Sequence, residues 1–284
     1  MRPVQRLHSA YRDDIGDLVT RRPVPGPGLD RVGAFLFLNH HGPQTYPPHN
    51  RGLPFGPHPH RGFETVTFIL EGELAHTDSA GHESIIREGG VQWMTAGSGL
   101  VHAEISPDGF KRTGGPLEIL QLWVNLPARL KMCAPRYVGV QADAIRAIPG
   151  EGATVHLVSG AYRGEAGAIE SLTGVFLSWV EIAAGGRVTF EGLRGRDVFL
   201  YGARGAIEVG GTLVPAFTLA ELGEGDAVTI EAHEPALFLF GHAEPIDEPV
   251  VAHGPFVMNS VAEIHQAYAD YQAGIFGVAE IVRG

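Results

Sequence analysis

The sequence has little cysteine and little lysine. Cys133 is the only cysteine in 284 residues, so an internal disulfide is excluded and a reducing compartment is expected. Lysine occurs only at Lys111 and Lys131, and 32 acidic residues against 21 lysines and arginines give a formal net charge of −11. An acidic chain repels the phosphate backbone of nucleic acids. We therefore expect no direct binding of nucleic acid.

Long hydrophobic runs are also missing. The longest apolar runs, such as Phe35–Leu38, have the size of a strand, whereas a membrane-spanning helix needs about 20 apolar residues. No apolar segment typical of a secretory signal follows the amino terminus. These absences predict a cytoplasmic protein without a membrane partner.

Turn-forming residues are abundant. The chain has 39 glycines and 20 prolines, about a fifth of its length, while 44% of residues are hydrophobic and 19% are charged. The last two values are ordinary for globular proteins and exclude wholesale disorder. The length favours two domains. The composition therefore predicts turn-rich β-structure.

Strand-like runs fill the chain up to about Tyr137 and then recur with the same rhythm. They are rich in aromatic and β-branched residues and are separated by turn residues. The runs of the first series are Phe35–Leu38, Thr65–Leu70, Ser84–Arg87, Gln92–Thr95 and Ile119–Asn125. Those of the second are Thr154–Val158, Phe176–Glu181, Arg187–Phe190, Asp197–Tyr201, Ala206–Val209, Ala227–Ile230 and Ala236–Phe240. The pattern predicts an all-β chain of two β-barrel domains, 1–140 and 141–284.

The end of the chain has a different pattern. Ser260 and Glu263 are spaced as a capping box, in which each side chain bonds a free backbone N–H at a helix start. Apolar residues then recur at spacings of three or four, at Val261, Ile264, Tyr268 and Tyr271. The spacing predicts a helix over about 260–273 whose apolar face packs against a barrel.

Two short segments suggest a metal site. Residues two apart in a strand project from the same face, so His58 and His60 form one candidate pair, and His102 and Glu104 form another. Imidazole nitrogen is a common ligand of iron, zinc, copper and nickel. Three imidazoles and one carboxylate fill four positions of an octahedron and leave two open for substrate or O₂.

Glu64 is a competing ligand. Its even number matches His58 and His60, so strand alternation does not exclude it. The first cupin motif places a metal-binding glutamate at this position in Gly52-x5-His58-x-His60-x3-Glu64, although Gly72 lies one residue later than that motif expects. The residues alone leave Glu64 and Glu104 both open, and the family resemblance given below favours Glu104 as the ligand, with Glu64 behind the ligands or in the pocket wall.

Longer blocks of sequence resemble one bicupin family, the pirins. The blocks are HPHRGFETVTFILEGEL (58–74), GGVQWMTAGSGLVHAE (89–104), LQLWVNLP (120–127) and GPFVMNS (254–260). The resemblance covers nearly the whole chain and is strongest over 55–127. It implies two stacked cupin, or jelly-roll, β-barrels with a C-terminal helical tail.

The resemblance also implies one divalent metal ion in the first barrel. Its ligands fall on His58, His60, His102 and Glu104. Iron(II) is the expected metal, with nickel, cobalt, manganese, copper and zinc as alternatives. The second barrel has no paired histidines in its counterpart strand, residues 186–190, and we expect it to be structural.

The activity implied by the resemblance is that of a quercetinase. Such an enzyme opens the heterocyclic ring of a flavonol with O₂ and releases carbon monoxide, and Glu104 is the expected proton acceptor, with Glu64 as the alternative. The partners are then a small aromatic substrate and O₂, with the protein as a monomer. A second hypothesis is a metal- or redox-dependent interaction module, such as a transcription coregulator, without turnover. A metal-bound isomerase or hydrolase is a third.

Other residues are assigned ordinary roles. We expect His40 and His41 to lie at a solvated strand end and Cys133 to be an inert thiol. Trp93, Met94 and Trp123 are expected in the core.

Overall fold

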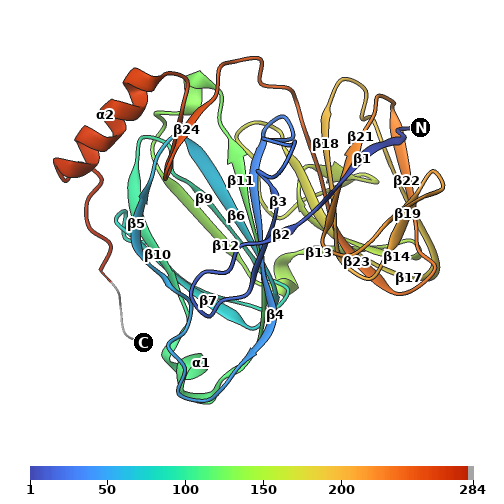
Figure 1. The fold of residues 1–284 in the computed structure, drawn as a ribbon, viewed down its shortest axis with the longest axis horizontal. Coiled ribbons are helices and arrows are strands. Elements are labelled where there is room, and N and C mark those ends of the chain that lie inside the picture. Colours follow the sequence, from blue (N-terminus) through green and yellow to red (C-terminus); the bar gives the residue numbers. More distant parts are fainter. Residues whose placement is uncertain (281–284) are drawn as a thin grey trace. The chain divides into compact units, whose positions relative to one another are not determined.

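Strands dominate the described part of the chain, residues 1–280, in the computed structural model (Figure 1). The helices are α1 (Asp108–Thr113) and α2 (Val261–Gln272), with single 3₁₀ turns at Ala128–Leu130 and Ala142–Ala144. No helix in residues 1–280 is long and apolar enough to cross a membrane. The predicted all-β class is confirmed, and so is the helix near the end of the chain.

Contacts divide the chain into two compact units. The carboxy-terminal unit contains residues 1–12, 21–40 and 143–245, and the amino-terminal unit contains 13–20, 41–142 and the segment from Ile246 onward. The segment that carries α2 therefore belongs to the same unit as His58, His60 and His102. The division into domains 1–140 and 141–284 stays a prediction.

The amino-terminal unit contains two groups of antiparallel strands. One sheet has the order β5-β10-β7-β8, and the other contains the run β12-β9-β6-β11 followed by β4, of which residues 41–46 belong to this unit. The bounds of the first sheet are Phe55–His60 (β5), Leu100–Ile105 (β10), Glu73–Asp78 (β7) and Glu83–Arg87 (β8). Those of the second are Arg136–Val140 (β12), Val91–Thr95 (β9), Phe63–Glu71 (β6), Gly115–Asn125 (β11) and Phe35–Tyr46 (β4).

Both sheets contribute to one apolar core in this unit. Ile69 of β6 and Ile119 of β11 pack in the same buried cluster as Leu74 of β7 and Ile86 of β8. Strand alternation places one side-chain set of each strand inside, so the same inward faces continue from this core to the polar residues described below. The predicted strands of the first half all lie within observed ones.

The carboxy-terminal unit contains a larger antiparallel sheet. Its order is β1-β21-β18-β23-β17-β22-β19-β20, with β13 and β14 added at β17. The bounds are Val4–Ser9 (β1), Thr218–Leu222 (β21), Asp197–Arg204 (β18), Ala236–Ala243 (β23), Phe176–Glu191 (β17), Ala227–Glu231 (β22), Ile207–Val209 (β19), Thr212–Val214 (β20), Arg146–Pro149 (β13) and Glu151–Ser159 (β14). The two predicted runs at 176–181 and 187–190 form the single long strand β17.

Short strands complete the described chain. They are Tyr11–Arg12 (β2), which pairs with Thr20–Val24 (β3), Ala161–Tyr162 (β15), which pairs with Glu165–Ala166 (β16), and Val251–His253 (β24), which pairs with Phe256–Met258 (β25).

The histidines of the carboxy-terminal unit do not gather. His233 is exposed and contacts Glu208, while His242 accepts a hydrogen bond from Arg196 and stacks on Phe176. Burial and the Arg196 charge lower the pKa of His242 to about 3. Within residues 1–280, no group of three metal-binding side chains occurs in this unit.

Helix α2 begins at the predicted cap. The Ser260 Oγ accepts a hydrogen bond from the Glu263 N–H at 3.3 Å, while the Glu263 carboxylate bonds the Asn259 N–H at 3.0 Å. The predicted apolar face is wrong at both ends. Ile264 and Ala267 are the buried positions, whereas Val261 is 59% exposed and Tyr271 39% exposed, because only the middle of the helix packs against β24 and β25.

Removing the cap should loosen the first turn of α2. Ser260→Ala leaves the Glu263 N–H without its acceptor, at a cost of about 1 kcal/mol. Amide exchange over 261–264 should then be about fivefold faster than in the wild type, measured by hydrogen–deuterium exchange. Ser260→Thr keeps the acceptor and should exchange like the wild type. Equal rates in all three proteins would show that the cap contributes nothing.

Candidate metal centre

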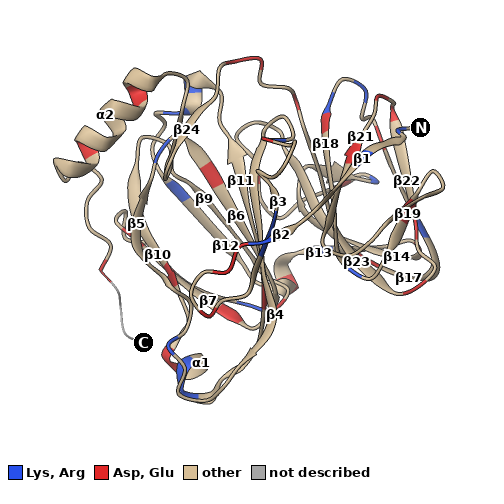
Figure 2. Ribbon diagram, in the orientation of Figure 1, with Lys and Arg blue, Asp and Glu red and all other residues tan. Residues whose placement is uncertain are grey.

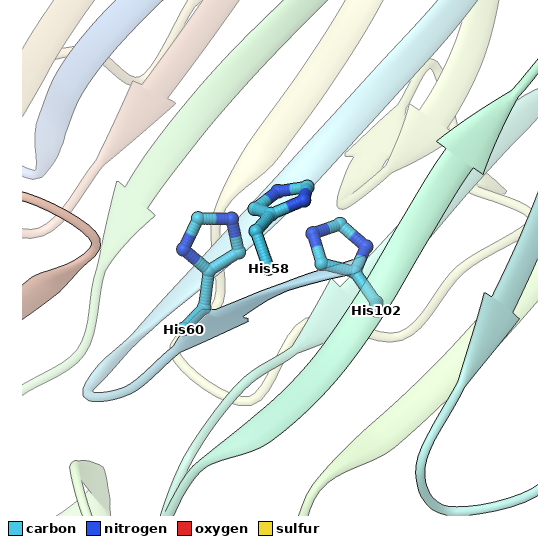
Figure 3. Close-up of side chains that lie close together, drawn as sticks. All are labelled: His58, His60 and His102. Atoms are coloured by element: carbon cyan, nitrogen blue, oxygen red, sulfur yellow. The ribbon is translucent and has the colours of Figure 1, made fainter. Parts of the chain in front are cut away.

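Three histidines converge in the amino-terminal unit. His58 and His60 come from β5 and His102 from β10 (Figure 3). One ring nitrogen of each lies within 4.8 Å of the corresponding atoms of the other two. His60 and His102 are buried, and His58 is half-buried. A metal ion bound at this point of the interior would have three nitrogen ligands.

The pairing of β5 with β10 produces this convergence. His102 lies directly opposite His58 in the antiparallel ladder, and their ring centroids are 4.3 Å apart. His60 is two residues further along β5, on the same face, and its ring centroid lies 4.9 Å from that of His102. The His-x-His pattern thus acts as predicted, because strand alternation turns both rings to one side.

Backbone carbonyls orient two of the rings. The Nδ1 of His58 lies 2.8 Å from the Gly56 oxygen, and the Nδ1 of His60 lies 3.2 Å from the Pro255 oxygen. An N–H at Nδ1 donates to each carbonyl, which leaves Nε2 of each ring unprotonated and free to bind a metal.

The surroundings of His102 show whether these residues fit a metal ion. His102 is fully buried, yet neither of its ring nitrogens has a hydrogen-bond partner. A buried polar atom without a partner costs free energy, so a native structure normally satisfies it. A metal ion bound by the three imidazoles satisfies one nitrogen of His102, and the residues present therefore fit such an ion.

Burial keeps the imidazoles of His60 and His102 neutral. It lowers the pKa of His60 to about 3, with the His58 charge as a smaller cause, and lowers the pKa of His102 well below its usual range. Only the neutral imidazole binds a metal, so no proton competes with the metal at these two residues near neutral pH.

Glu104 lies on the same face of β10 as His102. Its Oε1 accepts hydrogen bonds from the Thr67 hydroxyl at 3.1 Å and from the Gln92 amide, and its Oε2 accepts one from the Gln121 amide at 2.5 Å. Three donors thus hold the carboxylate in place. Glu104 is not part of the three-residue group, and its role as a fourth ligand stays a prediction.

The network behind Glu104 continues to the edge of the sheets. The Tyr137 hydroxyl donates to the Gln92 carbonyl oxygen at 3.2 Å and also bonds the Ser84 hydroxyl. This fixes the Gln92 amide, so that its NH₂ group faces Glu104. The Tyr137 ring also stacks on His76, with centroids 4.1 Å apart. A chain of hydrogen bonds therefore orients the carboxylate.

Glu64 points away from the three histidines. Thr67 faces Glu104, and Glu64 is three residues earlier on the regular strand β6, so its side chain is on the opposite face. The parity argument for Glu64 fails because Gly62, with φ +87°, forms a turn between β5 and β6 and resets the alternation. Glu64 instead accepts a hydrogen bond from the Thr95 hydroxyl at 2.7 Å, and its Oε2 has no partner.

Aromatic side chains border the centre on the His60 side. The Phe63 ring lies 5.0 Å from that of His60, and the Trp123 ring lies 5.3 Å from it. Trp93 and Met94 are buried as predicted, but the assignment of Trp123 to the core is wrong. Residues 119, 121 and 123 alternate toward the same face as Thr67, a period-two signal that could have identified Gln121 and Trp123.

His40 and His41 are buried, so the solvated strand end predicted for them is wrong. The Nδ1 of His40 bonds the Tyr201 hydroxyl at 3.0 Å, and the Nδ1 of His41 bonds the Thr20 hydroxyl at 2.9 Å. Cys133 is half-buried, and burial followed by the Glu64 charge raises the pKa of its thiol. A raised pKa disfavours the reactive thiolate, in line with an inert thiol.

The carboxyl of Glu64 should make stability depend on pH. Burial raises its pKa to about 7, whereas the pKa of a glutamate in the unfolded chain is about 4.3. The folded state therefore binds more protons between these values, and its stability falls as pH rises from 5 to 8, by up to about 3 kcal/mol. Glu64→Gln should remove this loss in urea unfolding at the two pH values.

The exposed residue Glu170 provides the control for this measurement. Glu170→Gln should retain the pH dependence of the wild type. A Glu64→Gln protein with the same dependence would contradict the raised pKa.

Two family models and several known proteins match most of the chain. The Pirin family model matches residues 17–124, and the model of the Pirin C-terminal cupin domain matches residues 178–277. A pirin-like protein of Caulobacter vibrioides is 42% identical over 226 residues, 78% of this chain and 80% of its own. Pirin of Homo sapiens is 35% identical over 262 residues, covering 89% and 86% of the two chains.

A solved structure confirms the fold over nearly the full length. The crystal structure of a quercetin 2,3-dioxygenase from Acinetobacter baumannii superimposes with a TM-score of 0.91 and 33% identity, and the match covers 98% of this chain and 99% of that one. The bicupin architecture implied by the sequence blocks is thereby confirmed. On these matches, the chain belongs to the pirin family.

Proposed function

We propose that this protein is a metal-dependent dioxygenase that opens flavonols such as quercetin with O₂ and releases carbon monoxide. The observation that carries the proposal is the buried group of His58, His60 and His102, in which both nitrogens of His102 lack partners. The likeness to a quercetin 2,3-dioxygenase at 33% identity over nearly the whole chain supports it.

The metal would be held by His58, His60 and His102, with Glu104 as the fourth ligand. Bound there, a divalent ion would act as a Lewis acid that stabilises an oxyanion. Its open coordination positions would bring substrate and O₂ together. Imidazole with one carboxylate suits iron(II), and the same donors accept nickel, cobalt, manganese, copper or zinc.

Glu104 is the residue that takes the substrate proton. A flavonol becomes electron-rich only after its 3-hydroxyl loses a proton, and a carboxylate beside the bound substrate can accept it. Bonds from Thr67, Gln92 and Gln121 fix the carboxylate, so its position costs no reorganisation during the reaction. Glu64 cannot substitute for it, because that carboxyl lies on the other face of β6.

The ring of Trp123 favours a flat substrate. It is half-buried beside His60, next to the proposed metal position, while Phe63 is fully buried against it. Aromatic faces bind a planar ring system through stacking and burial. We therefore expect an aromatic substrate rather than a small polar acid.

Turnover of the loaded protein tests the proposal. After anaerobic loading with iron(II), addition of quercetin and O₂ should give a loss of the flavonol absorbance together with an equal amount of carbon monoxide. Glu104→Gln should lower this rate at least about 100-fold, because the proton acceptor is lost. Glu64→Gln is the matched control and should retain the rate. Metal bound without turnover would instead favour an interaction module that works without catalysis.

His58→Ala tests the ligand assignment independently of the base. Loss of one imidazole should remove both the bound metal, measured by elemental analysis, and the turnover. His233→Ala, at an exposed histidine of the other unit, should keep both. Turnover that persists in metal-free His58→Ala would contradict a metal-dependent mechanism.

A further inference from the structure

The segment 251–280 packs along the outside of β5 and β10 in the amino-terminal unit (Figure 1). We call this segment the strap; it contains β24, β25, α2 and the residues up to Glu280. Its apolar side chains share one buried cluster with Val101 of β10. Because Val101 and His102 are neighbours on a strand, Val101 faces the strap while His102 faces the metal centre.

The first part of the strap holds the residues that surround His60. The Pro255 carbonyl accepts the hydrogen bond from His60 Nδ1, and the Val257 N–H donates to the Arg61 carbonyl at 3.1 Å. The buried Lys131 ammonium donates to the Gly62 carbonyl and to the Val257 carbonyl, each at 2.9 Å. The turn after His60 is therefore bonded to the strap on both sides.

Arg61 links this turn to α2. Its guanidinium is 3% exposed and pairs with Asp270 at 2.7 Å, while its Nε donates to the Ser98 carbonyl at 2.8 Å. It also lies 4.6 Å from the centre of the Phe276 ring. Figure 2 shows acidic residues on α2, whose sequence contains Asp270. One arginine thus joins the His60 turn, the loop before β10 and the helix.

Two glycines allow the strap to approach this closely. A Cβ at Gly62 would lie 2.0 Å from the Val257 carbonyl oxygen, and one at Gly99 would lie 2.5 Å from the Phe276 ring. Gly62 follows His60 and Gly99 precedes β10, so the segments that carry the histidines also have the glycines that close packing of the strap requires.

The end of the strap is held by β7 and the turn that follows it. The Ser79 hydroxyl donates to the Phe276 carbonyl at 2.6 Å, and the Thr77 hydroxyl donates to the Glu280 carbonyl at 3.0 Å. The strap is therefore bonded to both strands beside His102 and to the turn beside His60.

We propose that the strap is a positioning element of the metal centre: through the Pro255 carbonyl and the Arg61–Asp270 pair it sets the ring of His60, and its docking is coupled to metal binding. The inference rests on the metal site of the proposed function. A carbonyl that accepts the Nδ1 proton fixes the ring and its metal-binding Nε2, and loss of such partners typically lowers metal affinity 10- to 100-fold. Coupling is reciprocal, so the metal must also stabilise the docked strap.

Cobalt(II) binding by the full-length chain tests this, since its visible spectrum reports the ligand geometry. Affinity is measured by competition with a chelator. Asp270→Ala removes the partner of Arg61 and should weaken cobalt binding about tenfold and shift the spectrum. Gln266→Ala is the matched control, because Gln266 bonds only the other oxygen of Asp270, at 2.7 Å, and leaves the Arg61 pair in place. It should bind cobalt like the wild type.

Hydrogen exchange of the wild type provides the second measurement, which needs no variant to fold. Cobalt should slow exchange over 255–272 in the wild type. Unchanged exchange, or Asp270→Ala with wild-type affinity and spectrum, would overturn the inference and leave the proposed function standing. A wild-type protein that binds no cobalt and no iron would overturn both.

Discussion

The direct opposition of His58 and His102 across β5 and β10 is the contact on which the metal centre depends. It fixes the register of the two strands, and the register in turn decides which side chains face inward. His60 and Glu104 follow from it, because each is placed by alternation along β5 or β10 from this pair. A slip of β10 by one residue would turn His102 and Glu104 to the opposite face.

The centre combines two kinds of support. One backbone carbonyl accepts a hydrogen bond from each of His58 and His60, while two side-chain amides and the Thr67 hydroxyl donate to Glu104. His102 has no such bond, although it is the most deeply buried of the three. Hydrogen bonds thus orient the outer histidines and the carboxylate, while His102 has nitrogens that a metal ion could satisfy.

Local patterns predicted the strands, the helix cap and the two same-face pairs His58/His60 and His102/Glu104, because each depends on neighbours in sequence. The family resemblance, and not local spacing, implied that His102 joins the other two histidines. Glu64 shows where such reasoning stops: its parity with His60 holds only within one strand, and the backbone turn at Gly62 ends that strand. The face of α2 was misjudged at Val261 and Tyr271 because the helix packs over its middle only. The partners of His60 and Arg61, Pro255 and Asp270, are too distant in sequence for any periodicity to reveal.

The separation between His60 and the carbonyl that orients it is 195 residues along the chain. At a synthesis rate of about 5–20 residues per second, this interval corresponds to roughly 10–40 seconds on the ribosome. The three histidines therefore leave the ribosome, and can fold into their sheet, well before Pro255 and Asp270 exist. The ring of His60 therefore gains its orienting carbonyl only in the last stage of synthesis.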